Sequence, residues 1–281
     1  MKNQRSIPLA MTIAGSDPGG GAGLQADLKT FAACRVYGFS VLTAIIAQNS
    51  NRVARMVGVD PAMVAAQISL LAEERRPDAL KTGALAMAAN VRTIAESIRE
   101  LRLPAPVVDP VMLSSSGHRL LDLAGEKSLI VDLLPLARVV TPNIPEAERL
   151  SGIAIDTPAA MRLAARAIRK LGARAVVIKG GHPFRGAGAF DSSRATDLLL
   201  DGRSFIELSS ARIPGGGAHG AGCAFSAAIA AHLARGESLE CAVRLAKQFM
   251  TRTLRRPIRF GAGRPLLDHL SVASPVRVAP R

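Results

Sequence analysis

One glycine-rich stretch late in the chain combines groups that suit phosphate chemistry. It reads Pro214-Gly-Gly-Gly-Ala-His-Gly-Ala-Gly-Cys223 and leads directly into an alanine-rich segment with helical composition. The first turn of a helix exposes unpaired N–H groups and carries about half a positive charge, so it attracts anions. Gly220 and Gly222 would let a phosphate approach the backbone, and the helix dipole should favour the thiolate of Cys223. By itself, the turn is almost as well explained by a small buried cysteine that packs the start of a helix.

A second glycine-rich loop, Gly15-Ser-Asp-Pro-Gly-Gly-Gly-Ala-Gly23, lies between a predicted strand and a predicted helix. No Gly-Lys-Ser/Thr follows, so it is not a P-loop. The dinucleotide-binding fingerprint also fails, because Leu24 occupies its third glycine position. The loop could bring the backbone close to a ligand or could simply turn the chain tightly, and the sequence favours neither alternative.

Charged residues stand at the ends of predicted strands. Asp109 follows Val107-Val108, Glu146 follows a Thr-Pro-Asn-Ile-Pro run, and Lys179 ends an apolar segment before two glycines. Magnesium prefers a few carboxylates together with phosphate oxygens and water, and phosphoryl transfer needs cations that neutralise the moving group. Taken singly, each carboxylate is better explained as a helix cap or turn residue. Lys179 taken singly could extend its ammonium group from a strand end into water.

Apolar strands and amphipathic helices alternate along the chain and must position these residues. Strands are predicted at 7–14, 40–47, 55–59, 79–82, 106–109, 138–141 and 175–179, with a hairpin over 197–208 that turns at Asp201-Gly202. Helices are predicted at 24–34, 61–74, 88–101, 124–134, 145–150, 158–171, 221–235 and 239–255. This order predicts an α/β fold, with a largely parallel sheet covered by helices on both faces. We expect one domain over residues 1–270, a frayed basic tail over 271–281, and ligands beyond the carboxyl ends of the strands.

The composition weighs against several classes of protein. The chain has 281 residues, of which 48% are hydrophobic, which suffices for a substantial core. No uncharged apolar run is long enough to span a membrane. Three widely spaced cysteines, Cys34, Cys223 and Cys241, predict neither a disulfide framework nor a metal site, so a cytoplasmic location is expected.

The net charge of +14 could indicate a nucleic-acid-binding protein. However, the arginines are scattered along the chain, and aromatic residues make up only 3% of it, so platforms for base stacking are scarce. A solvated basic surface is the favoured interpretation. The histidines His118, His182 and His219 lack the spacing of metal ligands and are predicted to be polar loop residues.

Taken together and in order, seven segments resemble the hydroxymethylpyrimidine/phosphomethylpyrimidine kinases of thiamine biosynthesis. These segments are 14–31, 43–49, 81–85, 108–121, 141–147, 177–182 and 219–231, and the resemblance runs from about residue 9 to residue 270. It implies a ribokinase-like α/β fold and an enzyme that uses ATP and Mg²⁺. The implied substrates are 4-amino-5-hydroxymethyl-2-methylpyrimidine and then its monophosphate, and the implied assembly is a homodimer.

The resemblance also implies a role for each matching residue. The residues that would line or adjoin the pyrimidine pocket are Gly15, Asp27, Gln48 and Ala84. The residues that would serve ATP or magnesium are Asp109, Asn143, Glu146 and Lys179, of which Asp109 and Glu146 would hold the metal. The backbone of residues 220–223, including Gly220 and Gly222, would form an anion hole. Cys223 would be the base that accepts the proton of the substrate hydroxyl.

The chain departs from the resembled pattern at three points. The usual Asn-Thr-His-Gly-Thr-Gly-Cys reads Gly-Ala-His-Gly-Ala-Gly-Cys at 217–223, although a backbone anion hole should survive the lost side chains. Ala84 replaces a common methionine, and a serine within 114–116 replaces a common lysine. Two alternatives remain: a pyridoxal kinase of the same fold, and a non-catalytic pyrimidine-binding relative.

Overall fold

The structure is a computed structural model that describes residues 7–181, 193–213 and 217–272. Three parts of the sequence analysis lie outside these ranges. They are His182, residues 214–216 of the late glycine-rich stretch, and residues 273–281 of the predicted basic tail.

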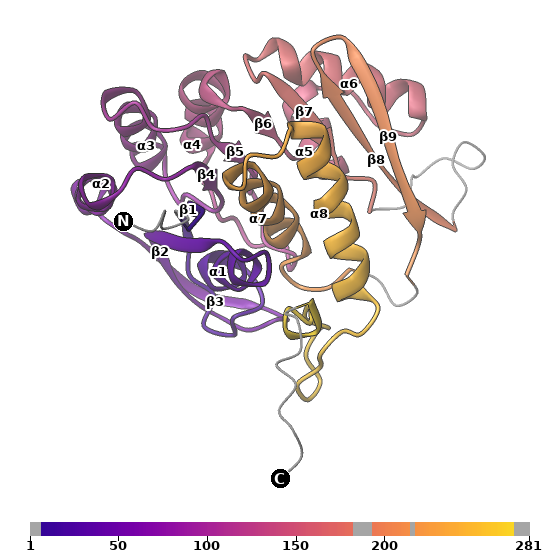
Figure 1. The fold of residues 1–281 in the computed structure, drawn as a ribbon, viewed down its shortest axis with the longest axis horizontal. Helices are drawn as coiled ribbons and strands as arrows, with labels where there is room; N and C mark the ends of the chain where they lie inside the picture. Colours follow the sequence, from indigo (N-terminus) through magenta and orange to yellow (C-terminus); the bar gives the residue numbers. More distant parts are fainter. Residues whose placement is uncertain (1–6, 182–192, 214–216, 273–281) are drawn as a thin grey trace, which may run out of the picture.

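Within the described residues, nine strands form one sheet in the order β3-β2-β1-β4-β5-β6-β7-β8-β9 (Figure 1). The strands are β1 (Leu9–Gly15), β2 (Tyr37–Gln48), β3 (Val53–Gly58), β4 (Ala79–Thr82), β5 (Val107–Val108), β6 (Val139–Val140), β7 (Ala175–Ile178), β8 (Arg194–Asp201) and β9 (Ser204–Ala211). The six strands from β2 to β7 in this order run parallel, whereas β3, β8 and β9 each run antiparallel to a neighbour. The predicted parallel sheet and the hairpin that turns at Asp201-Gly202 are therefore confirmed.

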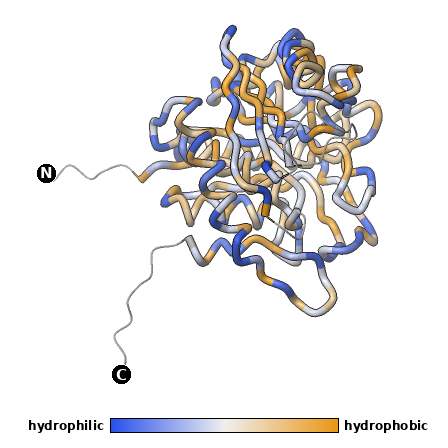
Figure 2. Tube along the Cα trace, turned by 90° about the vertical axis from the view of Figure 1, so that its right-hand side faces the viewer, coloured by the Kyte–Doolittle hydropathy of each residue, from blue (hydrophilic) through white to orange (hydrophobic). Residues whose placement is uncertain are grey.

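Helices cover both faces of the sheet, as predicted. They are α1 (Gly23–Ala33), α2 (Pro61–Glu74), α3 (Ala88–Glu100), α4 (Leu123–Ser128), α5 (Ile144–Ser151), α6 (Pro158–Lys170), α7 (Ala221–Ala234) and α8 (Leu239–Leu254). Helices α2, α3, α5 and α6 share one hydrophobic cluster with the sheet and with the turn after α4, and α1, α7 and α8 share another on the opposite face. Hydrophobic stretches run through the interior and many peripheral turns are hydrophilic, which fits two cores separated by the sheet (Figure 2).

The segment predicted as a helix over 124–134 is helical throughout, but it is not one regular α-helix. Helix α4 ends at Ser128, a single π-helical turn covers Leu129–Leu133, and a 3₁₀ turn follows at Leu134–Leu136. Pro135 supplies a physical reason, because it has no N–H for the next helical hydrogen bond. The change of geometry lies on the outer layer and does not reach the carboxyl ends of the strands.

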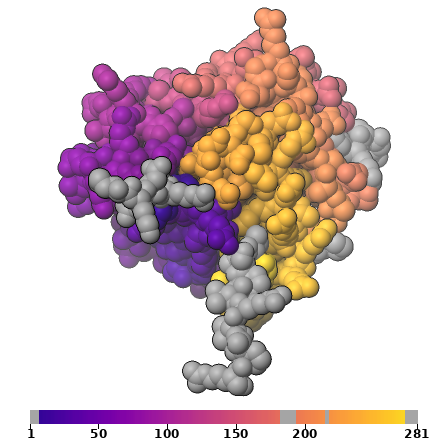
Figure 3. Space-filling model, viewed as in Figure 1, coloured from indigo at the N-terminus to yellow at the C-terminus, as the bar shows by residue number. Residues whose placement is uncertain are grey.

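Helix α7 lies centrally on one face of the sheet, between its neighbours α1 and α8 (Figure 1). It is apolar on every side, and nine of its residues are buried, which is typical of a helix enclosed by protein. The space-filling view shows the indigo N-terminal part and the orange and yellow C-terminal helices in contact along one face (Figure 3). The start of α7 therefore meets the loops that follow the parallel strands.

The start of α7 requires a glycine. Gly220, its N-cap, has a φ of +79°, a left-handed conformation that residues with side chains rarely adopt. A Cβ at this position would also overlap the carbonyl oxygen of Gly21 in the first glycine-rich loop. The two glycine-rich segments thus pack backbone against backbone, although about 200 residues separate them in sequence.

Replacing Gly220 with alanine should therefore destabilise the fold through two effects, backbone strain and a clash. Gly152→Ala is a matched control, because Gly152 has a φ of +70° but open space where the Cβ would go. The control should lose about 1–2 kcal/mol of unfolding free energy, the cost of the left-handed conformation. Urea denaturation should show a clearly larger loss for Gly220→Ala, and equal losses would contradict the close packing.

Candidate active site

The charged residues predicted at strand ends converge on the first turn of α7. Asp109 follows β5 and Lys179 follows β7, and the Lys179 Nζ donates to Asp109 Oδ1 at 2.9 Å. Asp109 Oδ2 accepts from Ser226 Oγ at 3.3 Å. A Cβ at Gly222 would lie 3.1 Å from Lys179 Nζ, so a glycine here leaves the ammonium group room beside the helix. The structure thus brings together three of the predicted residues, Asp109, Lys179 and Gly222, at one edge of the sheet.

Asn143 and Glu146 lie at the neighbouring strand end, where they cap α5. Asn143 Oδ1 accepts from the Glu146 N–H at 2.9 Å, and Glu146 Oε2 accepts from the Asn143 N–H at 2.8 Å. This reciprocal capping box uses one oxygen of each side chain. Burial raises the pKa of Glu146 to about 7, since the repulsion from Asp109 adds to the effect and the attraction of Lys179 offsets only part of it.

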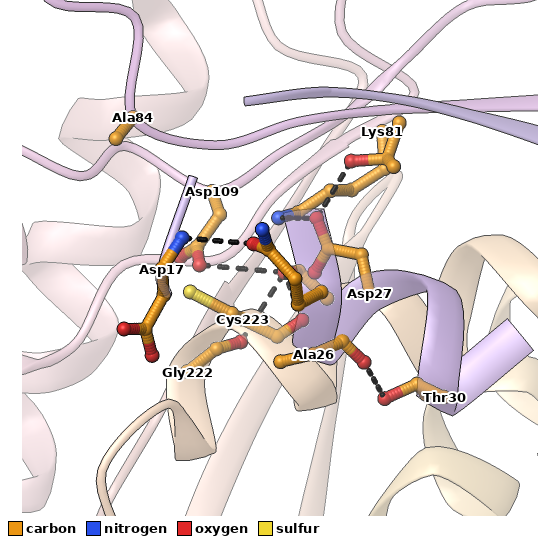
Figure 4. A network of polar contacts seen from close by, with 12 residues as sticks. Asp17, Ala26, Asp27, Thr30, Lys81, Ala84, Asp109, Gly222 and Cys223 are labelled. Atoms are coloured by element: carbon orange, nitrogen blue, oxygen red, sulfur yellow. Dashed lines mark hydrogen bonds and ion pairs between the residues drawn. The ribbon is translucent and has the colours of Figure 1, made fainter. Parts of the chain in front are cut away.

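A fully buried ion pair, Asp27 with Lys81, lies next to this group. Lys81 Nζ donates to Asp27 Oδ2 at 2.7 Å, and neither side chain has any exposed surface. Thr12 Oγ1 donates to the same oxygen at 2.6 Å, whereas Asp27 Oδ1 has no hydrogen-bond partner among the described residues. Figure 4 shows Asp27 on α1, Lys81 on β4 and Cys223 on α7 converging on one region, with Asp109 beside them.

The other predicted pocket residues occupy two places. The Gly15 N–H donates to the Ala84 carbonyl at 3.0 Å, and Thr43 Oγ1 donates to the same carbonyl at 2.6 Å, so Gly15 and Ala84 are adjacent. Gln48 ends β2 and is only half-buried. Its side chain forms a hydrogen bond that lowers the pKa of Asp17. Gly15, Ala84 and Gln48 therefore lie around the ends of β1 and β2. They do not all meet at one point.

The helix dipole was expected to favour the thiolate of Cys223, but the surroundings of the side chain act in the opposite direction. Burial raises the pKa of its thiol to about 11, and the carboxylates Asp109 and Asp27 raise it further. The attraction of Lys81 and a hydrogen bond from the Gly23 backbone oppose this effect without overcoming it. The side chain is half-buried and lies near the negative charges of Asp109 and Asp27, and both effects disfavour the thiolate.

The sequence analysis missed a buried contact between Asp17 and His219, which was predicted to be only a polar loop residue. His219 Nε2 lies 3.1 Å from Asp17 Oδ2. Asp17 also accepts the N–H groups of Gly19, Gly21 and Ala22 at 2.7–3.1 Å. Burial acts to raise the pKa of Asp17, but these hydrogen bonds and His219 lower it to about 2. The first glycine-rich loop thus uses its amides to hold Asp17.

This pair borders an open pocket of about 360 Å³, which also adjoins the loop of residues 114–116. Ser115 Oγ lies 3.5 Å from His219 Nδ1, and the Arg264 guanidinium donates to the Ser115 carbonyl at 3.0 Å. Arg264 therefore brings a cation to the loop in which a serine replaces the lysine of the resembled pattern.

Other classes of site find no support in the described residues. All three cysteines are free, and the described part of the chain contains no group of three or more histidine, cysteine or acidic residues placed to hold a metal ion. A search of the same residues finds no helix with the length and apolarity needed to cross a bilayer.

Comparison with known proteins places the chain in a defined group. The family model for phosphomethylpyrimidine kinase matches residues 17–268. The bifunctional thiamine biosynthesis protein ThiED of Geobacter sulfurreducens is 45% identical over 95% of this chain, although the chain spans only 53% of that relative. The hydroxymethylpyrimidine/phosphomethylpyrimidine kinase of Synechococcus elongatus is 42% identical, with 94% of this chain and 98% of the relative covered. The ADP complex of Bacillus subtilis pyridoxal kinase is 36% identical with a TM-score of 0.85, covering 95% of this chain and 99% of that one.

Asp17 should make the fold sensitive to acid. Because its pKa falls from the ordinary 3.8 to about 2 in the folded state, it stabilises the fold above pH 4, by about 2 kcal/mol. That contribution is lost as the pH falls from 4 through 2. Urea denaturation of the wild type and Asp17→Asn should differ most near neutral pH and converge as the pH falls to about 2. Exposed Asp156, which has no side-chain partner among the described residues, provides the control Asp156→Asn. A difference that does not vary with pH would contradict the assignment.

Proposed function

The chain belongs to the phosphomethylpyrimidine kinase family, and on that premise we propose that it phosphorylates 4-amino-5-hydroxymethyl-2-methylpyrimidine and then its monophosphate, using ATP. One structural observation supports the proposal independently of family membership. The Asp109–Lys179 ion pair lies against the first turn of α7, next to Cys223. Fixed cations and backbone N–H groups aimed at one point are what phosphoryl transfer requires.

The ATP phosphates would bind where α7 begins. The N–H groups of residues 220–223 include those that the first turn of a helix leaves without intrahelical partners. Lys179 would neutralise charge on the transferred phosphoryl group. Asn143 would contact the phosphates through its Nδ2, because its Oδ1 is engaged in the capping box.

Magnesium would be held by Asp109 and Glu146 together with phosphate oxygens and water. The donor set fits this ion, because magnesium is usually bound by one or two carboxylates plus substrate phosphates rather than by an all-protein cage. Glu146 Oε1 makes no hydrogen bond among the described residues, so it remains open to a ligand. When bound, the ion supplies positive charge to the phosphates.

The pyrimidine would lie near Gly15, Gln48 and Ala84, above the Asp27–Lys81 pair. Asp27 Oδ1 is a buried carboxylate oxygen without a partner in the described part of the chain, and buried polar atoms normally have one. An amino group on the ring would satisfy it, and Lys81 would keep Asp27 ionised. Since Asp27 has no exposed surface, this contact requires the side chains above it to move when the substrate binds.

Cys223 would accept the proton of the substrate hydroxyl as its oxygen attacks the γ-phosphate. The new bond joins this oxygen to phosphorus, ADP leaves, and the proton passes to the sulfur. Only the thiolate can accept it, and burial makes the thiolate a minor species at neutral pH. The reaction should therefore draw on a small ionised fraction of the enzyme.

Two further features belong to this proposal. We expect a homodimer in the cytoplasm, and the exposed apolar side chains of Ile45 and Val57 on the β2–β3 hairpin offer a surface for it. Light scattering coupled to gel filtration would measure the mass in solution.

Product analysis tests the proposed activity. The enzyme with ATP and Mg²⁺ should convert the pyrimidine alcohol to its monophosphate and then its diphosphate, resolved by chromatography. A strong preference for pyridoxal would instead support the alternative kinase of the same fold. Binding of ATP and pyrimidine without any transfer would identify a non-catalytic relative.

The role of Cys223 predicts a distinctive pH profile. Because the pKa of the thiol is about 11, the thiolate fraction and hence kcat should rise about tenfold per pH unit between pH 7 and 9. Cys223→Asp carries a base that is already ionised and should give a nearly flat profile. Cys223→Ala should lose about 10²- to 10⁴-fold in kcat with little change in ATP affinity. A flat wild-type profile, or an unimpaired alanine variant, would remove Cys223 as the base.

The role of Asp109 predicts a changed magnesium requirement. Asp109→Asn removes one of the two carboxylates, so the Mg²⁺ concentration that gives half the maximal rate should rise about tenfold or more. Asp156→Asn serves as a surface control. Circular dichroism should confirm folding, because the change also leaves Lys179 without its carboxylate partner. An unaltered magnesium titration would count against the assignment.

A further inference from the structure

A second concentration of charge lies at the opposite edge of the sheet from the candidate active site. Five exposed cations line one hollow of about 710 Å³ together with Leu200, Gly172, Ala173 and Gly202. We call this hollow the basic groove, and its cations are Arg166, Arg169, Lys170, Arg174 and Arg203. They come from the end of α6, the residue before β7 and the β8–β9 turn. In Figure 1 this turn lies beside α6 at the top of the view.

The basic groove is remote from the catalytic edge. Arg174 immediately precedes β7, whereas Lys179 immediately follows it, so the whole length of that strand separates the two sites. Strand β8 pairs antiparallel with β7 and brings Asp201 opposite Ala175, which places the β8–β9 turn at the amino end of β7. A ligand in the groove would therefore not touch the residues assigned to phosphate transfer.

No protein carboxylate neutralises these cations in the described residues. None of the five makes an ion pair or a side-chain hydrogen bond there. The two nearby acids are already engaged, since Asp201 lies 3.7 Å from Arg138 and Glu207 lies 2.7 Å from Arg162. A hollow lined by charges of one sign concentrates the electrostatic potential and attracts counter-ions.

Part of the basic groove is already ordered. The Arg166 guanidinium lies 5.2 Å from the centre of the Phe205 ring, an attractive cation–π arrangement. Arg162 packs on the same ring at 5.4 Å, so two guanidinium groups already contact this aromatic side chain. The apolar side chains that line the basic groove, Leu200 and Ala173, are buried.

We propose that the basic groove binds a compact polyphosphate anion. Arginine guanidinium groups pair with phosphate oxygens through two parallel hydrogen bonds, and four arginines line this groove. The volume of the hollow lies within the range of small-molecule sites. The shared chemistry is a short phosphoanhydride chain, either free or as the tail of a nucleotide.

Calorimetric titration of the full chain with tripolyphosphate, without magnesium, tests this proposal. The groove variant combines Arg169→Gln, Arg174→Gln and Arg203→Gln. A control of equal charge combines Arg55→Gln, Arg252→Gln and Arg256→Gln, which are exposed elsewhere. The wild type and the control should each bind one more equivalent of tripolyphosphate than the groove variant does. If the groove variant still binds this equivalent, its affinity should be at least tenfold lower. Turnover and thermal stability should be the same in all three.

Three results would overturn the proposal. Equal binding by the groove variant would show that the groove takes no polyphosphate, and equal loss in the control would reduce the effect to net charge. If single-stranded RNA binds more tightly than tripolyphosphate, and if the groove variant loses this binding, the surface is a nucleic-acid site. Repeating the titration with ATP distinguishes a free phosphate chain from a nucleotide tail.

Discussion

The close packing of two glycine-rich turns is the constraint on which the candidate active site depends. Gly220 can begin α7 only because it carries no side chain at the point where its backbone meets the Gly21 carbonyl. Asp17 and His219 join the same two turns through a buried contact. Together these interactions fix the first turn of α7 against the strand end of β1, and hence fix where its N–H groups point.

Buried charge gives the site its chemical character. The Asp109–Lys179 and Asp27–Lys81 pairs are almost or completely hidden from solvent. Buried ion pairs add little net stability, because desolvation offsets most of the attraction, so their value here is better explained by function. Ammonium groups held in place before the reaction can stabilise charge that develops during phosphate transfer. The same environment keeps the Cys223 thiol protonated, so one electrostatic arrangement both supports and limits the proposed chemistry.

Much of this arrangement follows from local sequence patterns. A window of a few residues is enough to recognise a strand end followed by Asp109 or Lys179, and the same holds for the glycine–alanine start of α7. The parallel sheet then brings these residues together. The Asp17–His219 contact joins residues 202 positions apart and has no local signal beyond their glycine-rich surroundings. The thiol pKa depends on burial and on three neighbouring elements, which no spacing reveals. The break after α4 escaped prediction because a single proline was outweighed by the apolar periodicity around it.

A crystal structure with a non-hydrolysable ATP analogue, Mg²⁺ and the pyrimidine alcohol would test the central claim most directly. The γ-phosphate should lie within hydrogen-bond distance of the N–H groups at the start of α7 and of Lys179 Nζ, with the substrate hydroxyl beside the Cys223 sulfur. A γ-phosphate bound at the first glycine-rich loop, with the start of α7 left uncontacted, would contradict it.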